Sequence, residues 1–312
     1  MPPDGPFHAG ELAAQALAGV SARGAGIRGF MPEQHRIFFG QLPWLFAGVP
    51  DRDGWPLATV LTGLPGFVAS PDPASLAIAA LPHSGDPAFS AFEPEHSIGL
   101  LGLEFETRRR NRANGTITAR DATGFTVAVE QSFGNCAKYI QARSREPDGS
   151  EPPGRPEHLS HLDGAARALI ATADTLFIAS AAAAGTPGGG IDISHRGGRP
   201  GFVRIDGDTL TIPDFAGNSY FNTFGNLLQE PRAALLFIDF DTGTALQLQG
   251  LAEIVWDGPE LAGLSGAERL WRFRVVRGWH RVSAVPLRWS ASDYAPTTLR
   301  TGIWAVPSAA AG

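Results

Sequence analysis

The chain repeats one pattern of residues at an interval of 135 positions. The tetrapeptide PGFV begins at Pro65 and again at Pro200, and 200 − 65 = 135. The same interval separates three further pairs of matching residues: Leu100 and Leu235, Phe105 and Phe240, and Gly115 and Gly250. Matches at separated places with one spacing indicate that the chain contains two copies of one module.

Each copy has the pattern of an antiparallel β structure. Short apolar runs alternate with turn-forming residues, and the 312 residues include 38 Gly and 25 Pro, which favours many turns and short strands. In the second copy, strands are predicted at 176–180, 191–195, 201–205, 209–212, 234–240 and 245–256. Helices are predicted at 10–20, 32–42 and 218–231. The predicted fold is therefore mainly β, with two tandem β-barrel modules and peripheral helices.

The seam between the two copies is a segment rich in proline and charge. Residues 143–159 include four prolines and few apolar residues, a composition typical of a linker. We therefore predict an N-terminal module with leading helices at 1–142, a Pro-rich linker at 143–160, and a C-terminal module at 161–312 that ends in an Arg- and Trp-rich tail.

Charge and hydropathy argue against several classes of function. The formal net charge is -6, so the chain as a whole does not attract nucleic acid. The sequence contains no run of apolar residues long enough to span a membrane and no signal-peptide pattern at its start, so we expect a cytoplasmic protein without a membrane partner. The single cysteine, Cys136, excludes an internal disulfide, and we interpret it as a packed residue.

Against this acidic background, the segment TRRRNRANG at 107–115 holds four arginines within five positions. Because side chains alternate between the faces of a strand, Arg108, Arg110 and Arg112 are expected on one face and Arg109 on the other. The cluster could guard an exposed edge strand, or it could pair with nearby acidic residues such as Glu104, Glu106 and Asp121. It could also bind nucleic acid, which the net charge disfavours, or the phosphate of a cofactor.

The segment 192–254 resembles the FMN-binding split barrels related to pyridoxamine 5′-phosphate oxidase. The resemblance rests on a Gly-Phe step at Gly201, a strand that ends at Asp214, the sequence QEPRAALLF at 229–237 and the sequence QGLAEI at 249–254. The first module is similar more faintly, in the manner of a two-module branch of predicted flavin-nucleotide-binding proteins. The resemblance implies a pair of split barrels with FMN bound at the interface between them.

Two departures from the oxidase pattern argue against pyridoxamine phosphate oxidation itself. The oxidase has an Arg/Lys pair at the start of the helix, where this chain reads SYFNT at 219–223. The Arg-Gln step on a later strand is also missing, because the chain reads TALQLQG at 244–250. The resemblance therefore supports the cofactor more than the reaction.

A bound FMN needs guanidinium or hydroxyl donors for its phosphate and polar partners for the edge of its ring. We expect the second module to hold the ring and the arginine strand of the first module to meet the phosphate across the interface. The candidate cofactor-binding residues of the second module are Ser194, His195, Arg196, Arg199, Asp214, Asn218, Asn222, Thr223, Asn226 and Gln247. Those of the first module are Arg108, Arg110 and Arg112. No catalytic residue and no metal ligand is predicted.

Several functions are compatible with these features. The leading hypothesis is an FMN-dependent oxidoreductase that acts on an unidentified small molecule and forms a homodimer. A second hypothesis is a flavin-binding or sensing protein without catalysis. A third is a haem-binding split barrel in which His195 or His280 ligates the iron. FAD and a deazaflavin are alternatives to FMN as the cofactor, and neither nucleic acid nor a membrane is expected as a partner.

Overall fold

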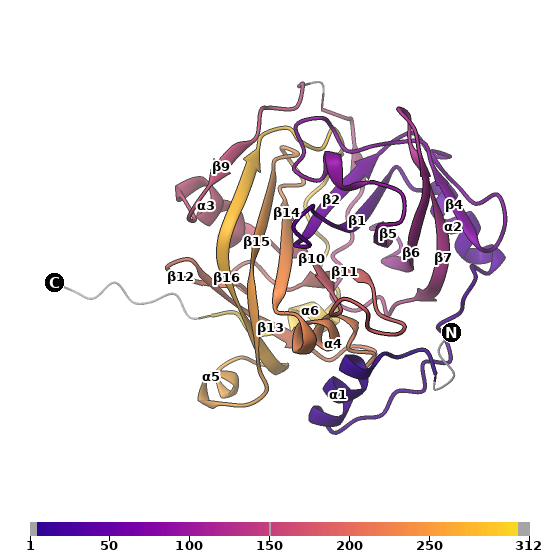
Figure 1. The fold of residues 1–312 in the computed structure, drawn as a ribbon. Coiled ribbons are helices and arrows are strands. Elements are labelled where there is room, and N and C mark those ends of the chain that lie inside the picture. Colours follow the sequence, from indigo (N-terminus) through magenta and orange to yellow (C-terminus); the bar gives the residue numbers. More distant parts are fainter. Residues whose placement is uncertain (1–4, 150, 305–312) are drawn as a thin grey trace.

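The computed structural model describes residues 5–149 and 151–304, and most of its regular structure lies in two β-sheets (Figure 1). The first sheet consists of β1 (Trp44–Pro50), β2 (Pro56–Thr62), β3 (Val68–Ala69), β4 (Ser75–Ile78), β5 (Ser97–Glu104), β6 (Arg109–Arg120) and β7 (Phe125–Gly134). The second consists of β10 (Thr175–Ala181), β11 (Ile191–Gly197), β12 (Arg204–Asp206), β13 (Thr209–Phe215), β14 (Arg232–Ile238), β15 (Ala245–Val255) and β16 (Ala267–Arg281), with β9 (Glu157–Leu159) paired to β16.

Helices and short elements connect and cover these sheets. They are α1 (Ala9–Leu17), α2 (Glu33–Gln41), the 3-10 helix η1 (Phe89–Ala91), α3 (Gly164–Thr172), α4 (Asn222–Gln229), α5 (Pro259–Ala262) and α6 (Pro296–Leu299). A separate two-stranded pairing joins β8 (Arg145–Glu146) to β17 (Arg288–Trp289). The helices predicted near residues 10–20, 32–42 and 218–231 correspond to α1, α2 and α4.

The two sheets have the same topology. The first has the strand order β2-β1-β5-β6-β7-β4-β3, and the second has the order β11-β10-β14-β15-β16-β13-β12. If the strands of each sheet are numbered along the chain, leaving out the added strand β9, both orders read 2-1-5-6-7-4-3. The predicted duplication is therefore confirmed in the fold, which is mainly β and contains two tandem barrel modules.

The segment between the modules and the Arg- and Trp-rich segment both take part in strand pairing. Residues 143–160 contain β8 and β9, each of which pairs with a strand from the C-terminal part of the chain. Ala267–Arg281 forms β16, which lies between β15 and β13 inside the second sheet. The division of the chain into domains at 143–160 stays a prediction.

Aromatic side chains from both sheets pack where the barrels meet. Phe46 of β1 stacks on Phe177 of β10, with ring centroids 3.7 Å apart and an interplanar angle of 17°. Both are fully buried in one apolar cluster drawn from the two modules. The approach is close enough that a Cβ atom on Gly99 of β5 would lie 2.6 Å from the carbonyl oxygen of Ile191, so only glycine fits there. The two barrels therefore share one apolar cluster at their interface.

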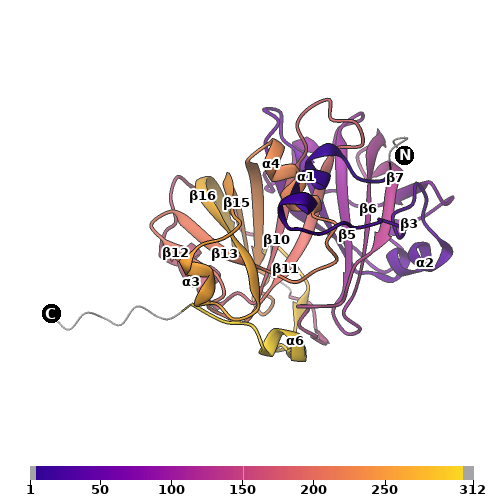
Figure 2. The same cartoon turned by 90° about the horizontal axis from the view of Figure 1, so that it is seen from below.

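The N-terminal helix α1 crosses over to the second barrel. Seen from below, it lies beside α4 (Figure 2), and the two helices are in direct contact. They approach so closely at Gly10 and Gly225 that a Cβ atom on Gly10 would overlap the Gly225 carbonyl. Among the described residues, no helix is long and apolar enough to cross a bilayer.

Candidate functional site

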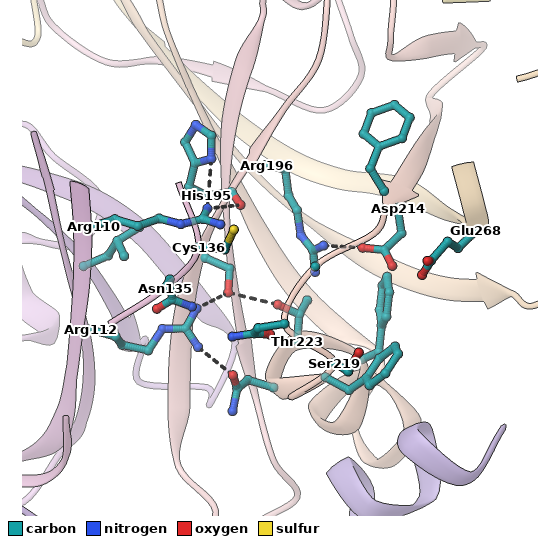
Figure 3. Close-up of a pocket in the computed structure, with 18 of the residues that line it drawn as sticks. Arg110, Arg112, Asn135, Cys136, His195, Arg196, Asp214, Ser219, Thr223 and Glu268 are labelled. Carbon is teal, nitrogen blue, oxygen red and sulfur yellow. Dashed lines mark hydrogen bonds and ion pairs between the residues drawn. The ribbon is translucent and has the colours of Figure 1, made fainter. Parts of the chain in front are cut away.

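A polar cavity lies between the arginine strand of the first barrel and four elements of the second. Its enclosed volume is about 100 Å³. Strand β6 and the segment after β7 contribute one wall, and β11, β13, β16 and the start of α4 contribute the others. Figure 3 shows Arg110 and Arg112 reaching from the first barrel toward Arg196 and Thr223 of the second. The cavity is therefore an interface site, built only when both modules are in contact.

Arg112 is the best-anchored side chain of the cavity. Strand β6 lies between β5 and β7, so it is an interior strand, and the edge-strand interpretation of the arginine cluster is wrong. The Arg112 side chain is buried and donates to Asp192 Oδ1 at 3.1 Å, to Asn222 Oδ1 at 3.1 Å and to the Ser194 hydroxyl. Its charge is compensated by Asp192, which lies behind the cavity wall.

Arg110 lies beside Arg112 but has no comparable compensation. It donates through Nη1 to Nδ1 of His195 at 3.2 Å, and within the described residues it forms no ion pair with a carboxylate. Burial, followed by the like charges of Arg112 and Arg196, lowers the pKa of Arg110 to about 10. A buried cation without a partner is costly, so Arg110 is a strong attractor for an anion.

The contact with Arg110 determines the tautomer and the protonation state of His195. A guanidinium can only donate, so Nδ1 of His195 accepts and the neutral ring carries its proton on Nε2. Burial and the nearby charges of Arg110 and Arg196 hold the pKa of His195 well below its ordinary value. The imidazole is therefore neutral at physiological pH and orients the Arg110 guanidinium.

On the opposite wall of the cavity, one carboxylate is paired with two arginines. Asp214 of β13 pairs with Arg196 and, at 3.2 Å, with Arg269 of β16. Burial raises the pKa of Asp214, while Arg196 and Arg269 oppose that shift. The Arg269 guanidinium also lies 4.8 Å from the ring centroid of Phe221, which helps to fix it. Because Asp214 binds these two arginines, it holds the wall in shape.

The cavity has more cationic than anionic groups and several donors without partners. Four arginines line it (Arg110, Arg112, Arg196 and Arg269) but only two carboxylates (Asp214 and Glu268). Within the described residues, the buried Nε atoms of Arg110, Arg112 and Arg196 form no hydrogen bond. These three atoms are closed off from solvent, so they lie in the wall and do not face the open space. The excess of arginines over carboxylates remains, and an anionic oxygen group in the cavity would supply the compensating charge.

The start of α4 adds backbone donors to the same cavity. Ser219 and Phe221, just before the helix, both have φ of 61°, in the left-handed region, and no side chain caps the helix N-terminus. Asn222 and Thr223 are buried there, and Thr223 donates to the Ser194 hydroxyl at 3.1 Å. An uncapped helix N-terminus beside four arginines favours an anion.

The structure brings most of the predicted site residues together. Nine of them line the cavity: Arg110, Arg112, Ser194, His195, Arg196, Asp214, Asn218, Asn222 and Thr223. Four do not: Arg108, Arg199, Asn226 and Gln247.

Three of these four residues hold neighbouring segments together instead. Arg108 was predicted on the same face as Arg110, but it lies in the turn before β6 with φ of 56° and pairs with Asp293 at 3.0 Å. Arg199 donates to the carbonyl of Thr301. Asn226 faces away from the cavity into the network around His8, described below.

Gln247 occupies the position in the second module that Arg112 occupies in the first, since 247 − 112 = 135. It faces the equivalent place on the other side of the molecule, where it donates to the Ala58 carbonyl at 3.0 Å and to Asp86 Oδ1 at 3.1 Å. Asp86 is also paired with the buried Arg281 at 2.7 Å. The second, pseudo-symmetric position is therefore filled by internal contacts.

Sequence reasoning missed several residues of the cavity. Asn135, Ser219, Glu268 and Arg269 line it. Asn135 could have been found from strand pairing, because its backbone N–H donates to the Arg110 carbonyl at 3.1 Å. Cys136 also lines the cavity and is exposed, so its interpretation as a packed residue is wrong. No pattern in the sequence marked these positions as polar neighbours of the arginine strand.

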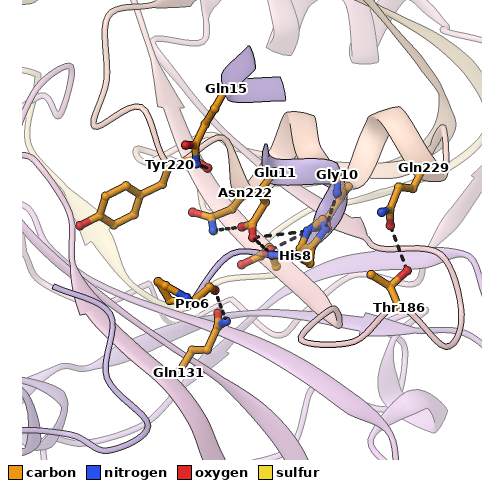
Figure 4. A network of polar contacts seen from close by, with 12 residues as sticks. Pro6, His8, Gly10, Glu11, Gln15, Gln131, Thr186, Tyr220, Asn222 and Gln229 are labelled. Carbon is orange, nitrogen blue, oxygen red and sulfur yellow. Dashed lines mark hydrogen bonds and ion pairs between the residues drawn. The ribbon is translucent and has the colours of Figure 1, made fainter. Parts of the chain in front are cut away.

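A buried network joins α1 to the cavity wall (Figure 4). Glu11 accepts from the backbone N–H of His8 at 2.8 Å and from the side chain of Asn222, which in turn accepts from Arg112. His8 contacts Asn226 Oδ1 at 3.0 Å. Burial and the negative charge of Asp192 raise the pKa of Glu11 to about 8, although the contacts with His8, Asn222 and Arg112 oppose the shift.

This pKa predicts that the protein loses stability as the pH rises. The folded protein keeps a proton on Glu11 that the unfolded chain releases near the ordinary value of 4.5, so the free energy of unfolding contributed by Glu11 falls between pH 4.5 and about 8 and then levels off. The Glu11→Gln variant should lose this slope. Thermal unfolding across that pH range checks it, with Glu33→Gln, an exposed first-turn glutamate of α2, as the matched control. An unchanged slope in Glu11→Gln would contradict the prediction.

Comparison with known proteins gives one match by sequence family. Residues 162–279 match the family model described as pyridoxamine 5′-phosphate oxidase. No match was found among the curated proteins.

Several solved structures are similar to parts of the chain. A protein of the pyridoxinephosphate oxidase family from Clostridium acetobutylicum, related to general stress protein 26 of B. subtilis, is 14% identical, with 40% of this chain and 91% of that chain covered and a TM-score of 0.27. A FAD-binding protein from Mesorhizobium loti is 10% identical, with 41% and 97% covered and a TM-score of 0.27. HutZ, the haem storage protein from Vibrio cholerae, is 15% identical, with 36% and 89% covered and a TM-score of 0.25.

At these identities and TM-scores the solved structures carry no functional conclusion. The family match covers the second module, which contributes β11, β13 and α4 to the cavity. By this match, the second barrel is similar to the pyridoxamine 5′-phosphate oxidase family.

Proposed function

We propose that the protein binds a flavin nucleotide, FMN, between its two barrels and uses it in the oxidoreduction of a small molecule. The observation that carries this proposal is the uncompensated Arg110 beside Arg112 and Arg196, three arginines that line one cavity. A dianionic phosphate group has the negative charge that Arg110 lacks and the acceptor atoms that guanidinium groups bind. Flavin is the phosphate-bearing cofactor that the resemblance of the chain implies.

The residues of the cavity fit the phosphate end of the nucleotide. Arg110 and Arg112 would provide charge, Ser194 and Thr223 hydroxyl groups, and the start of α4 backbone N–H donors. The enclosed volume of about 100 Å³ is below the roughly 300 to 1,000 Å³ of sites that bury a whole small molecule. The structure therefore supports the phosphate end of FMN more directly than the ring.

When bound, the flavin would supply the redox chemistry, and the chain would bind and orient it. Neutral His195 would hold the Arg110 guanidinium in place, and Asp214 would hold Arg196 and Arg269. The same groups would donate hydrogen bonds to the phosphates of FAD. The haem alternative is less well supported at His195, because the ring is buried and the contact of its Nδ1 with Arg110 leaves the proton on Nε2, the nitrogen that would ligate the iron.

A homodimer is not required to complete this cavity. Both of its walls come from one chain, with β6 in the first barrel and β11 in the second. The expected homodimer therefore remains a separate proposal, which sedimentation equilibrium of the purified protein tests.

The first test of the cofactor is the absorption spectrum of the purified full-length protein, followed by identification of the chromophore released by heat. We expect flavin bands and FMN in the released fraction, or uptake of added FMN by a colourless preparation. A Soret band would replace flavin with haem. A colourless protein that takes up no FMN would overturn the proposed function.

A further inference from the structure

A buried glutamate connects the N-terminal helix α1 to the cavity lined by Arg110 and Arg112 (the anion cavity). Glu11 is the third residue of α1 and accepts from the backbone N–H of His8 at 2.8 Å, as in a capping box. Its side chain is only 3% exposed. A Cβ atom on Gly225 of α4 would lie 2.5 Å from the backbone nitrogen of Glu11, so the close packing of the two helices requires a glycine there. Glu11 is therefore held against α4 and away from water.

Two hydrogen bonds lead from Glu11 to Arg112. The side-chain amide of Asn222 donates to Glu11, as Figure 4 shows, and Oδ1 of Asn222 accepts from Arg112 at 3.1 Å. A guanidinium can only donate, so Oδ1 of Asn222 must face Arg112 and its N–H groups must face Glu11. Asn222 and Arg112 both line the anion cavity. The state of Glu11 therefore reaches the anion cavity through Asn222.

The groups that face Glu11 differ in charge. Asp192 of β11 is negative and Arg112 of β6 is positive, and the two form an ion pair at 3.1 Å. His8 is neutral at physiological pH because burial lowers its pKa, and α4 contains no charged residue. Glu130 of β7, which lines a second cavity together with Glu11, is exposed to solvent. Burial and the charge of Asp192 raise the pKa of Glu11 to about 8, so Glu11 is neutral at pH 7 and ionises in mildly alkaline solution.

We propose that Glu11 is a positioning residue of the anion cavity: with a proton it holds Asn222 against Arg112 and adds no charge, and without the proton it weakens the binding of an anion. The ionised carboxylate adds a second negative charge beside Asp192, which offsets the attraction of Arg110 and Arg112 for the anion. In turn, a bound anion makes the proton on Glu11 harder to remove, so the anion and the proton bind cooperatively.

The direction of the pH effect follows from this coupling. The affinity for an anion is highest while Glu11 is protonated, falls as the pH rises through about 8, and then levels off. Binding of the anion near pH 8 takes up protons from solution. This inference rests on the anion site of the proposed function, but the anion need not be a flavin.

The test is isothermal titration calorimetry of the full-length protein with sulfate, a dianion whose charge is constant between about pH 6.5 and 9. We expect the affinity to fall about 4- to 20-fold across this range, the effect of one buried charge roughly 10 Å from the anion. Titrations in buffers of different ionisation enthalpy measure the proton uptake, which should reach about half a proton per anion near pH 8. An affinity that is constant or rises with pH, or binding without proton uptake, would overturn the proposal.

Glu11→Gln assigns the effect to one residue. Glutamine keeps an acceptor for Asn222 but cannot ionise, so this variant should bind sulfate at pH 9 about as tightly as at pH 6.5 and take up no proton. Glu33→Gln, an exposed glutamate in the first turn of α2, is the matched control and should keep both effects. Cys136 and Arg110, which also line the anion cavity, are unchanged in Glu11→Gln. A pH dependence that persists in Glu11→Gln would therefore belong to other groups and contradict the assignment.

Parallel titrations with FMN separate this inference from the proposed function. Sulfate binding with the expected pH dependence, but no FMN binding, would overturn the flavin function and support the role of Glu11. FMN and sulfate binding that are both independent of pH would support the function and overturn the role of Glu11. If neither anion binds, both proposals are wrong.

Discussion

Replacement of Arg110 by glutamine is expected to lower the affinity for FMN about 10- to 100-fold. Glutamine removes the uncompensated charge but retains an amide donor near His195. Hydrogen bonds to charged groups contribute about 1.5 to 3 kcal/mol, which corresponds to this change in affinity. Because Arg110 is destabilised by Arg112 and Arg196 in the free protein, the variant should unfold at the same temperature as the original or higher. Fluorescence titration with FMN and thermal unfolding measure the two effects.

The matched control for this experiment is Arg109→Gln. Arg109 is the neighbouring residue on the same strand, but its guanidinium lies 4.9 Å from the ring centroid of Phe38, and it does not line the cavity. FMN affinity should therefore be unchanged in this variant. Equal losses in the two variants would show a general effect of charge, and no loss in Arg110→Gln would contradict the phosphate assignment.

Replacement of Asp86 by alanine is expected to destabilise the protein by about 3 to 5 kcal/mol, the cost of leaving a buried charge without its partner. Asp86 accepts from Thr59 at 2.8 Å, from Gln247 at 3.1 Å and from Arg281 at 2.7 Å. The Arg281 side chain is only 4% exposed, so water cannot replace the lost carboxylate. The free energy of unfolding in urea measures the effect.

Two further variants separate a lost ion pair from a general defect. The double variant Asp86→Ala/Arg281→Met removes both charges and should recover most of the stability. Glu93→Ala breaks a pair with Arg120 in which the glutamate is half exposed, and it should cost less than about 1 kcal/mol. If Asp86→Ala lowers the free energy of unfolding by no more than Glu93→Ala does, the contacts of Asp86 with Thr59, Gln247 and Arg281 do not stabilise the filled pseudo-symmetric position.

The two predictions address the two pseudo-symmetric positions of the molecule. At one of them, Arg110 and Arg112 face an open cavity, and at the other, Gln247 and Arg281 are bound to Asp86. We therefore expect a stoichiometry of one FMN per chain. Duplication supplied two equivalent positions, and the side chains at Arg112 and Gln247 make them different.

Much of the candidate site could be predicted because it depends on local rules. Strand alternation places Arg110 and Arg112 on one face, and β6 follows that rule. The polar start of the helix at Asn222 and Thr223 was visible in the sequence and lines the cavity. Arg108 was misplaced because the strand begins one residue later, and strand ends are the least certain feature of a sequence pattern.

Other parts of the site depend on contacts between distant segments. Glu11 and Asn222 are 211 positions apart, and nothing in their local sequence indicates that they meet. The same holds for Gln247, whose position in the strand was correct but whose partners, Ala58 and Asp86, belong to the first barrel. The packing of the two sheets decides which side chains of one barrel contact which side chains of the other.

The sequence by itself determined the duplication, the β-rich fold and the arginine strand, because repeats, turn residues and two-residue alternation are properties of neighbouring positions. Only the tertiary structure decided that one interface position is an open cationic cavity and the other is filled. It also decided that α1 packs against α4. The physical reason is that burial, charge compensation and hydrogen-bond satisfaction depend on every group around a side chain, and most of those groups lie far away in the chain.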